Sequence, residues 1–495
     1  MKLKIKKLKF LTGRPVCIVH EKTANKLSVH VGERVSIKGN KNKQIISVVD
    51  TVSDILKPSE IAVSEEIIKK LNLKPGQKVK VELTEHPHSI ELIKKKLKGK
   101  SLSRKEIKEI VTNIANNSLT EVEVAFFVSA IYEEGMNLNE VKYLIQAMIE
   151  TGNSIKLKGK VVDKHSVGGG GNRTTPIIVS ICAASGLTMP KTSSRAITSA
   201  AGTADVIETI ANVDFSVEEI KKIIKKTKAC FVWGGSLGLA PVDDKIIKIE
   251  NIVTIDSPSQ LLVSILSKKI SVGSKYILID IPYGKSSKIP TRKKAEELKN
   301  KFLKLAKAFY LRLEVLLTDG REPIGNGIGP VLEMRDVIKV LKRDNPPKDL
   351  EEKSLMLSGK LLELTGKTKK GKGYALAKKI LDSGEAFRKF TQIIKAQKGN
   401  IEKLKKIQKP DFSYDIKSKK SHKIKHLNIK LINGLARSAG CPEDKSAGVY
   451  IHKKKNDLIK KGEKILTVYS ISKEKLKHAI KFYNKNKKHI IEFRS

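Results

Sequence analysis

Short apolar runs separated by turn residues make up the first part of the chain. Apolar and polar side chains alternate in LKIKKLKF, PVCIVH and QKVKVELTE, as in strands that bury one face. The stretches LSVHVGERVSI and LNLKPGQKVKVEL share the spacing apolar-x-apolar-x-x-Gly-x-x-Val. We predict a barrel-like β domain over residues 1–85, built from two related halves. Because its ionisable groups form no active-site pattern, we expect it to serve assembly.

The hydrophobic period changes to that of helices over residues 86–156. Gly135 and Gly152 stand where helix C-caps are expected. Three residues that favour N-caps are each followed by glutamate three positions later, as in a capping box: Ser103, Ser118 and Asn137. This pattern predicts a helical domain.

Strand-like and helix-like segments then alternate over residues 157–420. This alternation is typical of a mostly parallel sheet covered by helices, so the fold class is α/β. We expect a helix over residues 256–270 to pack on the helical domain. A polar connector over residues 409–426 leads to strands and a final helix, which predict a small α+β domain over residues 421–495.

The chain is strongly basic, with 98 Lys and Arg against 52 Asp and Glu and a net charge of +46. The lysines are spread over every segment, and no basic patch is interleaved with aromatic residues, so the pattern argues against a nucleic-acid partner. No apolar run approaches the ~20 residues that cross a bilayer, and no signal-peptide core is present. We therefore expect a cytoplasmic protein without a membrane partner. The four cysteines are far apart, which argues against a zinc site and a disulfide framework.

A run of four glycines interrupts residues 163–176, DKHSVGGGGNRTTP. A strand-like segment precedes it and an apolar helical segment follows it, with Thr174 or Thr175 as N-cap. A glycine loop that leads into a helix N-terminus favours an anion, and Lys164, Ser166, Arg173 and Thr175 add donors suited to phosphate. The spacing matches neither a P-loop nor a dinucleotide fingerprint, and a plain flexible loop is the alternative reading.

A second loop of small and hydroxyl residues, KTSSRAITSAAGTADVIE, covers residues 191–208. Thr203 is placed to cap the helix ADVIE. A packing loop with solvated serines would explain this segment alone. Two such loops after successive strands favour a ligand site, because ligands bind at the carboxyl ends of strands in open α/β sheets.

The two loops resemble the phosphate-loop signatures of the thymidine phosphorylase group. WGGSLGLAPVDDKII, DSPSQLLVSILSKK, TDGREPIGNGIGP and GLARSAGCPEDKSAGVYIHKK are also similar, so the resemblance covers essentially the whole chain. Within this group the chain looks most like the archaeal AMP phosphorylases. It shares their extra N-terminal β domain, the form SSRAITSAAGT, and a lysine in DIPYGKSSKIP. The implied fold is that of nucleoside phosphorylases and phosphoribosyltransferases.

The resemblance implies that AMP and phosphate react to adenine and ribose 1,5-bisphosphate, with CMP and UMP also accepted. It implies Asp256 as the proton donor. The implied AMP contacts are Gly168, Ser194, Arg195, Ala196, Ile197, Thr198, Ser199, Thr203, Ser264 and Lys288. The implied phosphate contacts are Lys164, Ser166, Thr175, Ser193 and Thr203, with His165 and Lys268 as further candidates. No cofactor and no metal are implied, since phosphate is a co-substrate, and we expect a homo-oligomer formed through the N-terminal and helical domains.

Asp256 must hold a proton near neutral pH to act as an acid. We expect burial beside Ile252 and Ile255 to favour that form. On spacing alone, Asp256 could instead cap the helix SQLLVSIL. Asp243 and Asp244 look like a metal pair but fit a helix start with acidic residues in its first turn.

Some positions depart from the nucleoside enzymes. These enzymes read a pyrimidine with an arginine, where this chain offers only Lys248 and Ile249, which argues against thymidine. Asn326 and Gly238 also differ from the bulkier or more polar residues of related enzymes. The alternatives are a pyrimidine-nucleoside phosphorylase, a phosphoribosyltransferase, which would need an acidic Mg²⁺ cluster, and a basic RNA-binding protein.

Overall fold

The computed structural model describes residues 1–12, 14–39, 43–84, 87–168, 173–196, 199–253, 255–407 and 410–494. The chain divides into two compact units, of which the first combines Met1–Gly152 with Ala240–Ser264 and the second combines Asn153–Leu239 with Ile265–Ser495. None of the helices in the described ranges combines the length and the apolar character that a membrane crossing requires. The predicted mixed α/β class is confirmed.

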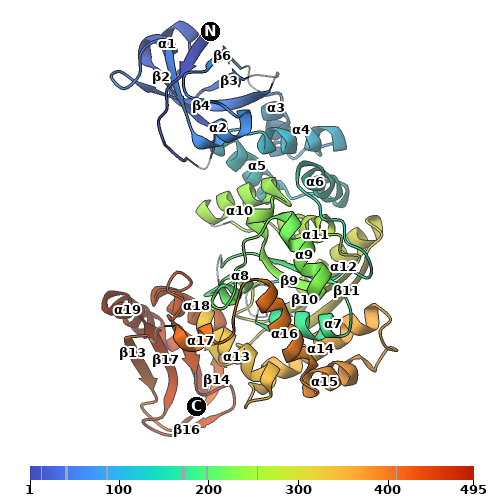
Figure 1. The fold of residues 1–495 in the computed structure, drawn as a ribbon. Helices are drawn as coiled ribbons and strands as arrows, with labels where there is room; N and C mark the ends of the chain where they lie inside the picture. The colour runs from blue at the N-terminus through green and yellow to red at the C-terminus, as the bar shows by residue number, and fades with distance from the viewer. Residues whose placement is uncertain are drawn as a thin grey trace. The chain divides into compact units, whose positions relative to one another are not determined.

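The first unit begins with a closed six-stranded barrel in the order β1-β5-β2-β4-β3-β6 (Figure 1). Two stretches of strand, helix and strand build most of it, and both helices end at a left-handed residue, Ser28 or Asn72. The repeated spacing thus corresponds to two halves with the same local structure. The elements are β1 (Lys2–Ile5), β2 (Val16–His20), α1 (Glu21–Leu27), β3 (Arg34–Lys38), β4 (Gln44–Val52), β5 (Glu60–Val63), α2 (Glu65–Leu71) and β6 (Lys78–Leu83).

Helices complete the first unit, and α10 packs on α4, α5 and α6. The capping boxes at Ser103 and Asn137 and the C-caps at Gly135 and Gly152 are confirmed. The predicted cap at Ser118 is wrong: its N–H bonds to Asn113 at the end of α4, and the cap is Thr120. The helices are α3 (Ser89–Leu97), α4 (Arg104–Ala115), α5 (Glu121–Glu134), α6 (Leu138–Thr151) and α10 (Pro241–Val253); α11 (Pro258–Ser271) spans the division between the units.

A parallel sheet forms the centre of the second unit. Strands β11, β10 and β7 pair in this order, β8 pairs with β9, and a parallel bridge between Val161 and Thr188 links the two groups. The strands are β7 (Val162–Ser166), β8 (Met189–Ser193), β9 (Ala229–Trp233), β10 (Tyr276–Tyr283) and β11 (Arg312–Asp319). The helices are α7 (Thr174–Ala184), α8 (Thr203–Glu208), α9 (Val217–Thr227), η3 (Gly234–Leu237), α12 (Arg292–Ala308), α13 (Pro330–Lys342), α14 (Lys348–Leu364), α15 (Gly373–Asp382), α16 (Glu385–Ala396) and α17 (Lys403–Lys406).

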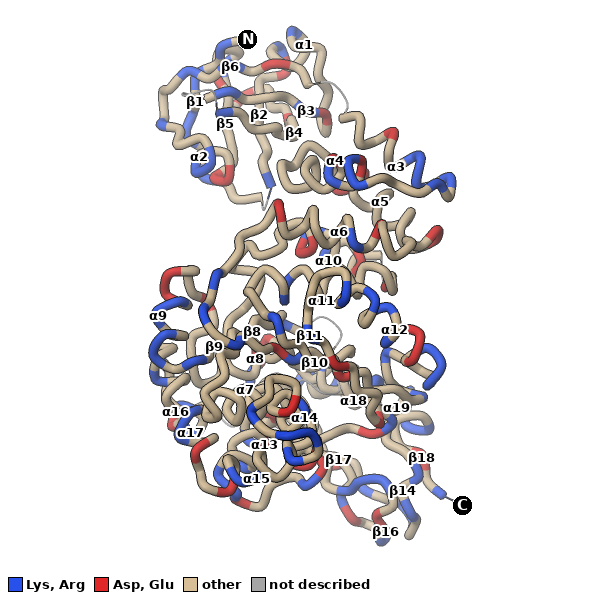
Figure 2. Tube along the Cα trace, turned by 90° about the vertical axis from the view of Figure 1, so that its right-hand side faces the viewer, with Lys and Arg blue, Asp and Glu red and all other residues tan. Residues whose placement is uncertain are grey.

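Two small antiparallel sheets and two helices end the second unit. The segment predicted as a polar connector, residues 409–426, instead contains strand β13 and most of β14, because Ile416 and Ile424 are buried in the core of this part. The elements are β12 (Gly327–Ile328), β13 (Phe412–Lys417), β14 (His422–Leu427), α18 (Ile429–Ser438), β15 (Gly448–Ile451), β16 (Leu458–Ile459), β17 (Lys464–Ser470), α19 (Lys473–Ile490) and β18 (Ile491–Arg494). Figure 2 shows basic residues throughout both units, as the sequence indicates.

Candidate active site

The loops after β7, β8 and β10 bring the predicted residues of the second unit together. These strands are parallel, so their carboxyl ends lie at one edge of the sheet. β7 ends at Ser166, β8 ends at Ser193, and the loop after β10 carries Lys288. Of the predicted positions, Ile197 and Thr198 lie outside the described residues, as do glycines 169–171 of the glycine run.

Gly168 and Lys288 are neighbours, although they are far apart in sequence. Gly168 has φ +87°, and a Cβ at this position would lie 3.0 Å from the Lys288 Cβ. A larger residue would therefore be strained by its backbone and would also press on the lysine. The two predicted AMP contacts thus share one corner of the sheet edge.

Lys164 of β7 is buried. Its side chain is 1% exposed, and Nζ donates to Thr174 Oγ1 at 3.0 Å, at the start of α7. Burial lowers the pKa of Lys164 to about 7, and Lys353 and Lys191 add to this effect while Asp280 opposes it. An anion beside Nζ would reverse the shift, since it stabilises the charged form.

Asp163 joins two further lysines below the site. Its carboxylate lies 3.2 Å from Lys191 Nζ and 2.6 Å from Lys269 Nζ, and all three side chains are buried. Lys191 also donates to the carbonyl of Lys164 at 2.9 Å. Burial lowers the pKa of Lys269, which the ion pair with Asp163 opposes.

A second buried carboxylate, Asp280 of β10, supports Ser166. Ser166 Oγ donates to Asp280 Oδ2 at 2.6 Å, and Thr318 Oγ1 donates to Oδ1 at 2.5 Å. Lys353 Nζ from α14 lies 3.1 Å from the same carboxylate. Although burial opposes ionisation, Lys353 and Lys164 lower the pKa of Asp280, so that it is ionised.

The floor of the site carries an excess of buried positive charge. This group has more lysines than carboxylates, which favours an anionic ligand. Its members are the four lysines Lys164, Lys191, Lys269 and Lys353 and the two aspartates Asp163 and Asp280. Sequence reasoning missed all of these except Lys164. Charged residues inside strands of a parallel sheet, which are normally apolar, are the signal that could have found those on β7, β8 and β10.

His165 lies in β7 among these lysines. Burial, with Lys269 and Lys191 next in importance, lowers the pKa of His165 well below its usual value. The imidazole is therefore neutral at pH 7, and it can contact a ligand without adding charge.

The loop after β8 is held by an acidic residue of α8. Asp205 Oδ2 accepts from the N–H groups of Ala196 and Gly202, at 2.7 and 2.9 Å. A Cβ at Gly202 would lie 2.4 Å from the Ser194 carbonyl oxygen, so only glycine fits there. Gly202 is also the N-cap of α8, which corrects the prediction that Thr203 caps this helix.

Two arginines of the loops have structural partners. The Arg195 guanidinium donates two 2.6 Å hydrogen bonds to Glu208 and lies over the Trp233 ring. In this structure the side chain, predicted to contact AMP, is therefore engaged by Glu208. The Arg173 guanidinium, predicted as a phosphate donor, donates to the carbonyls of Ile324 and Gly327 and pairs with Glu333. Arg173 is also the N-cap of α7, in place of the predicted threonine.

The remaining hydroxyls differ in how they are engaged. Ser193 Oγ lies 3.4 Å from the Val232 carbonyl, and Ser199 Oγ donates to the Ala201 carbonyl at 3.0 Å. The side chains of Thr175 and Thr203 make no hydrogen bond within the described residues. These two hydroxyls are available to donate to an anion.

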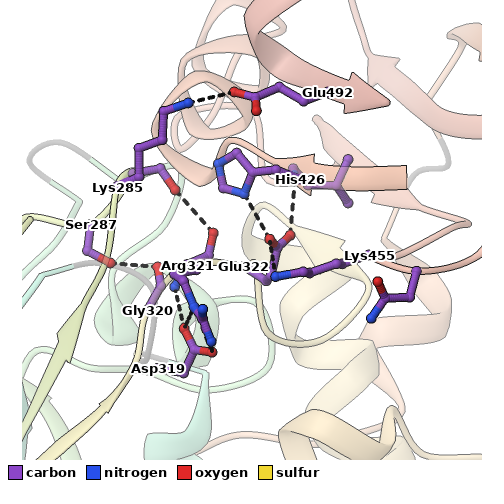
Figure 3. A network of polar contacts seen from close by, with 12 residues as sticks. Lys285, Ser287, Asp319, Gly320, Arg321, Glu322, His426, Lys455 and Glu492 are labelled. Carbon is purple, nitrogen blue, oxygen red and sulfur yellow. Dashed lines mark hydrogen bonds and ion pairs between the residues drawn. The ribbon is translucent and has the colours of Figure 1, made fainter. Parts of the chain in front are cut away.

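A polar network ties the loop of Lys288 to its neighbours (Figure 3). Ser287 Oγ donates to the Gly320 carbonyl at 2.6 Å, and Ser286 Oγ donates to the Arg321 carbonyl at 3.2 Å. Lys285 Nζ lies 2.9 Å from Glu492 of β18. The loop after β11 and strand β18 thus hold the loop after β10, which carries Lys288 and is called the lysine loop below.

Asp256 and Ser264 belong to the first unit. Ser264 Oγ donates to Asp243 Oδ2 at 2.7 Å, and Gln260 Nε2 donates to Oδ1 at 2.7 Å. Asp243 lies in the first turn of α10, as the helix-start interpretation predicts. Ser257, not Asp256, accepts the hydrogen bond from the Gln260 N–H near the start of α11. The expected burial of Asp256 is wrong: it is exposed.

The residues around Asp256 do not shield its carboxyl group from solvent. Ile252, expected to bury the carboxyl, is itself 69% exposed. Lys268, the further candidate on α11, is half-buried in the second unit. Within the described parts of the chain, no group of three or more His, Cys, Asp or Glu residues is arranged to hold a metal ion.

Three family models match the chain in the order of its parts. They are a glycosyl transferase family helical bundle domain over residues 90–152, a glycosyl transferase family a/b domain over 158–387, and a pyrimidine nucleoside phosphorylase C-terminal domain over 423–489. The anthranilate phosphoribosyltransferase of Thermus thermophilus has the same fold over 62% of this chain and 99% of its own, with a TM-score of 0.53 and 18% identity.

Curated relatives decide the family. The AMP phosphorylase of Pyrococcus abyssi is 44% identical, and that of Pyrococcus horikoshii 43%, each over 97% of this chain and 96% of the relative. AMP phosphorylase 1 of Archaeoglobus fulgidus is 40% identical over 98% of this chain and 96% of the relative. The chain belongs to the AMP phosphorylase family. Membership in the AMP phosphorylase family accounts for the phosphate-loop motifs, and the predicted resemblance is confirmed.

Proposed function

We propose that this protein catalyses the phosphorolysis of AMP to adenine and ribose 1,5-bisphosphate, and that CMP and UMP react in the same way. The observation that carries the proposal is the buried cationic floor at the sheet edge, in a chain of the AMP phosphorylase family. Phosphate is already a nucleophile, so it needs placement rather than activation. Lysines, hydroxyls and backbone N–H groups can supply that placement.

In this proposal, inorganic phosphate contacts Lys164, Ser166, Thr175, Ser193 and Thr203. The available hydroxyls of Thr175 and Thr203 and the low pKa of Lys164 support these roles. The phosphate oxygen attacks C1′ of the ribose, and the bond to the base breaks. Preorganised donors of this kind typically contribute about 10²–10³-fold each to the rate.

The 5′-phosphate of the nucleotide contacts Lys288 in this proposal. The contact between Gly168 and Lys288, and the network that holds the lysine loop, support it. Arg195 stabilises the loop after β8 by its hydrogen bonds to Glu208, and the nucleotide contacts the backbone of residues 194–196. A lysine that binds this phosphate would make the enzyme prefer nucleotides to nucleosides.

Asp256 is proposed as the acid that protonates the departing base, a role worth about 10²–10⁴-fold. Ser264 is proposed to contact the nucleotide and His165 and Lys268 to line the site. An acid must hold its proton until the bond to the base breaks, and a dry environment favours the protonated form of a carboxyl group. The role therefore requires that nucleotide binding removes water from Asp256.

We also propose that the protein self-associates through its first unit and needs no cofactor or metal. Exposed Val122 and Phe126, four residues apart on α5, support self-association. Light scattering of the purified protein measures the oligomeric mass.

The test is phosphate-dependent release of free base from AMP, CMP, UMP, adenosine and thymidine, assayed in parallel with a chelator present. We expect cleavage of the nucleotides and at most slow cleavage of the nucleosides. Cleavage of nucleosides alone would replace the proposal with a pyrimidine-nucleoside phosphorylase. Cleavage of none would overturn it.

A further inference from the structure

Ser166 differs from the other hydroxyls at the sheet edge, because its proton is already in use. Its Oγ lies 2.6 Å from Asp280 Oδ2, and both side chains are buried. An ionised carboxylate only accepts hydrogen bonds, so Ser166 must be the donor in this pair. A serine hydroxyl has one proton, and therefore Ser166 presents only lone pairs to a ligand.

Two other groups keep Asp280 in the state that captures this proton. Thr318 Oγ1 donates to Oδ1 at 2.5 Å, and Lys353 Nζ lies 3.1 Å from Oδ2. Lys353 also donates to Thr318 Oγ1 at 3.0 Å, which leaves the threonine proton for Asp280. The three residues come from β10, β11 and α14, so Ser166 is oriented by tertiary contacts.

Thr175 and Thr203 provide the contrast within the same site. Neither side chain has a hydrogen bond within the described residues, so each hydroxyl can donate to any oxyanion. Their contacts cannot distinguish a protonated anion from a fully ionised one. Ser166 can, because an anion that meets it must supply the proton.

We propose that Asp280, by holding Ser166 as a hydrogen-bond acceptor, makes the site select an oxyanion that carries a proton, hydrogen phosphate, over fully ionised oxyanions such as sulfate. This inference rests on the proposed function, in which phosphate binds beside Ser166. Hydrogen phosphate donates its P–O–H to Ser166 Oγ, while Ser166 donates to Asp280. Sulfate has no proton at neutral pH, so its oxygen lone pairs would face the lone pairs of Ser166 Oγ without a hydrogen bond between them. Asp280, Thr318 and Lys353 are positioning residues in this arrangement.

The expected effect follows from leaving a buried polar contact unmade. Such a mismatch lowers affinity by about 10- to 100-fold. Arsenate, which keeps a proton as phosphate does, should bind nearly as well as phosphate. The ranking phosphate, arsenate, then sulfate is therefore the signature of the Ser166–Asp280 pair, whereas cationic residues alone would bind the doubly charged anions alike.

The experiment is calorimetric titration of the intact protein with phosphate, arsenate and sulfate, without nucleotide. The decisive variant is Asp280→Asn combined with Lys353→Met, which removes both charges together. An asparagine amide can donate to Ser166, which frees the serine proton for the ligand. We expect the preference for phosphate over sulfate to fall at least about tenfold in this variant. The matched control is Thr175→Val, which should weaken both anions by the same factor.

Each result decides the inference. Equal binding of phosphate and sulfate by the unaltered protein would overturn it, and phosphate-dependent base release would leave the proposed function standing. A preference that survives in the double variant would overturn the assignment to Asp280. If that variant does not fold, Ser166→Ala gives the second test: phosphate should weaken while sulfate does not. Absence of both phosphate binding and base release would overturn the proposed function as well.

Discussion

The barrel and the parallel sheet use lysine in opposite ways. In the barrel, the strand lysines of β1 and β6 alternate with buried apolar residues and face outward. In the sheet, Lys164 and Lys191 are buried and face carboxylates and hydroxyls. Exposed lysines cost little, whereas buried ones need partners that several strands must supply. The difference shows that the large net charge says little about function, while the position of a few lysines says much.

The largest difference in stability should follow from removing one charge in each region. Lys353→Met leaves Asp280 buried without its nearest lysine, and we expect a loss of about 3–5 kcal/mol in the free energy of unfolding. Urea unfolding followed by circular dichroism, which reports on both units, measures it. The matched change Lys38→Met in the barrel removes a partly exposed pair with Glu82 and should leave the free energy of unfolding almost unchanged. Equal losses would contradict the comparison.

Loss of Lys164 should affect activity more than stability. Lys164→Met replaces a buried charge with an apolar side chain of similar length, so the fold should persist. We expect kcat/KM for phosphate to fall about 10²–10³-fold, because the proposed contact between phosphate and a buried cation is lost. Base-release kinetics with AMP at varied phosphate measure it. Activity close to that of the unaltered protein would remove Lys164 from the site.

Lys288 should matter for one substrate only. We expect Lys288→Met to raise the KM for AMP about 10- to 100-fold, because a charge-assisted contact with the 5′-phosphate is lost. The slow cleavage of adenosine should not change, since adenosine lacks that phosphate. Lys378→Met, which removes a surface pair with Asp382 on α15, serves as the control with little effect. Equal losses with AMP and adenosine would mean that Lys288 acts elsewhere.

The buried lysines should also make phosphate binding depend on pH. Burial lowers the pKa of Lys164 to about 7, and phosphate favours the charged form. Above pH 7 the free protein must therefore take up a proton to bind phosphate, and the KM for phosphate should rise up to about tenfold per pH unit. Lys164→Arg stays charged in this range and should not show this rise. The same rise in both proteins would assign it to another group.

Local patterns predicted much of the fold. Hydrophobic alternation indicated the barrel, and the serine- and asparagine-to-glutamate spacings identified two capping boxes, because these features depend on residues a few positions apart. The N-cap predicted at Ser118 is wrong because the Ser118 N–H bonds to the end of α4, while Thr120 is the N-cap of α5. The polar segment with strands β13 and β14 was misread because only a few buried isoleucines in it mark the sheet.

The sequence by itself determined the two loops, their hydroxyl and glycine content, and the family. Only the tertiary structure decided which charges meet. Asp280, Thr318 and Lys353 lie far from Ser166 in sequence and reach it through the order of parallel strands, which residue spacing does not encode. Packing of the chain likewise decides that Arg195 pairs with Glu208 of α8 and that Asp256 is exposed. Short-range geometry is written in the sequence, whereas the partners of a buried charge depend on how distant strands and helices pack.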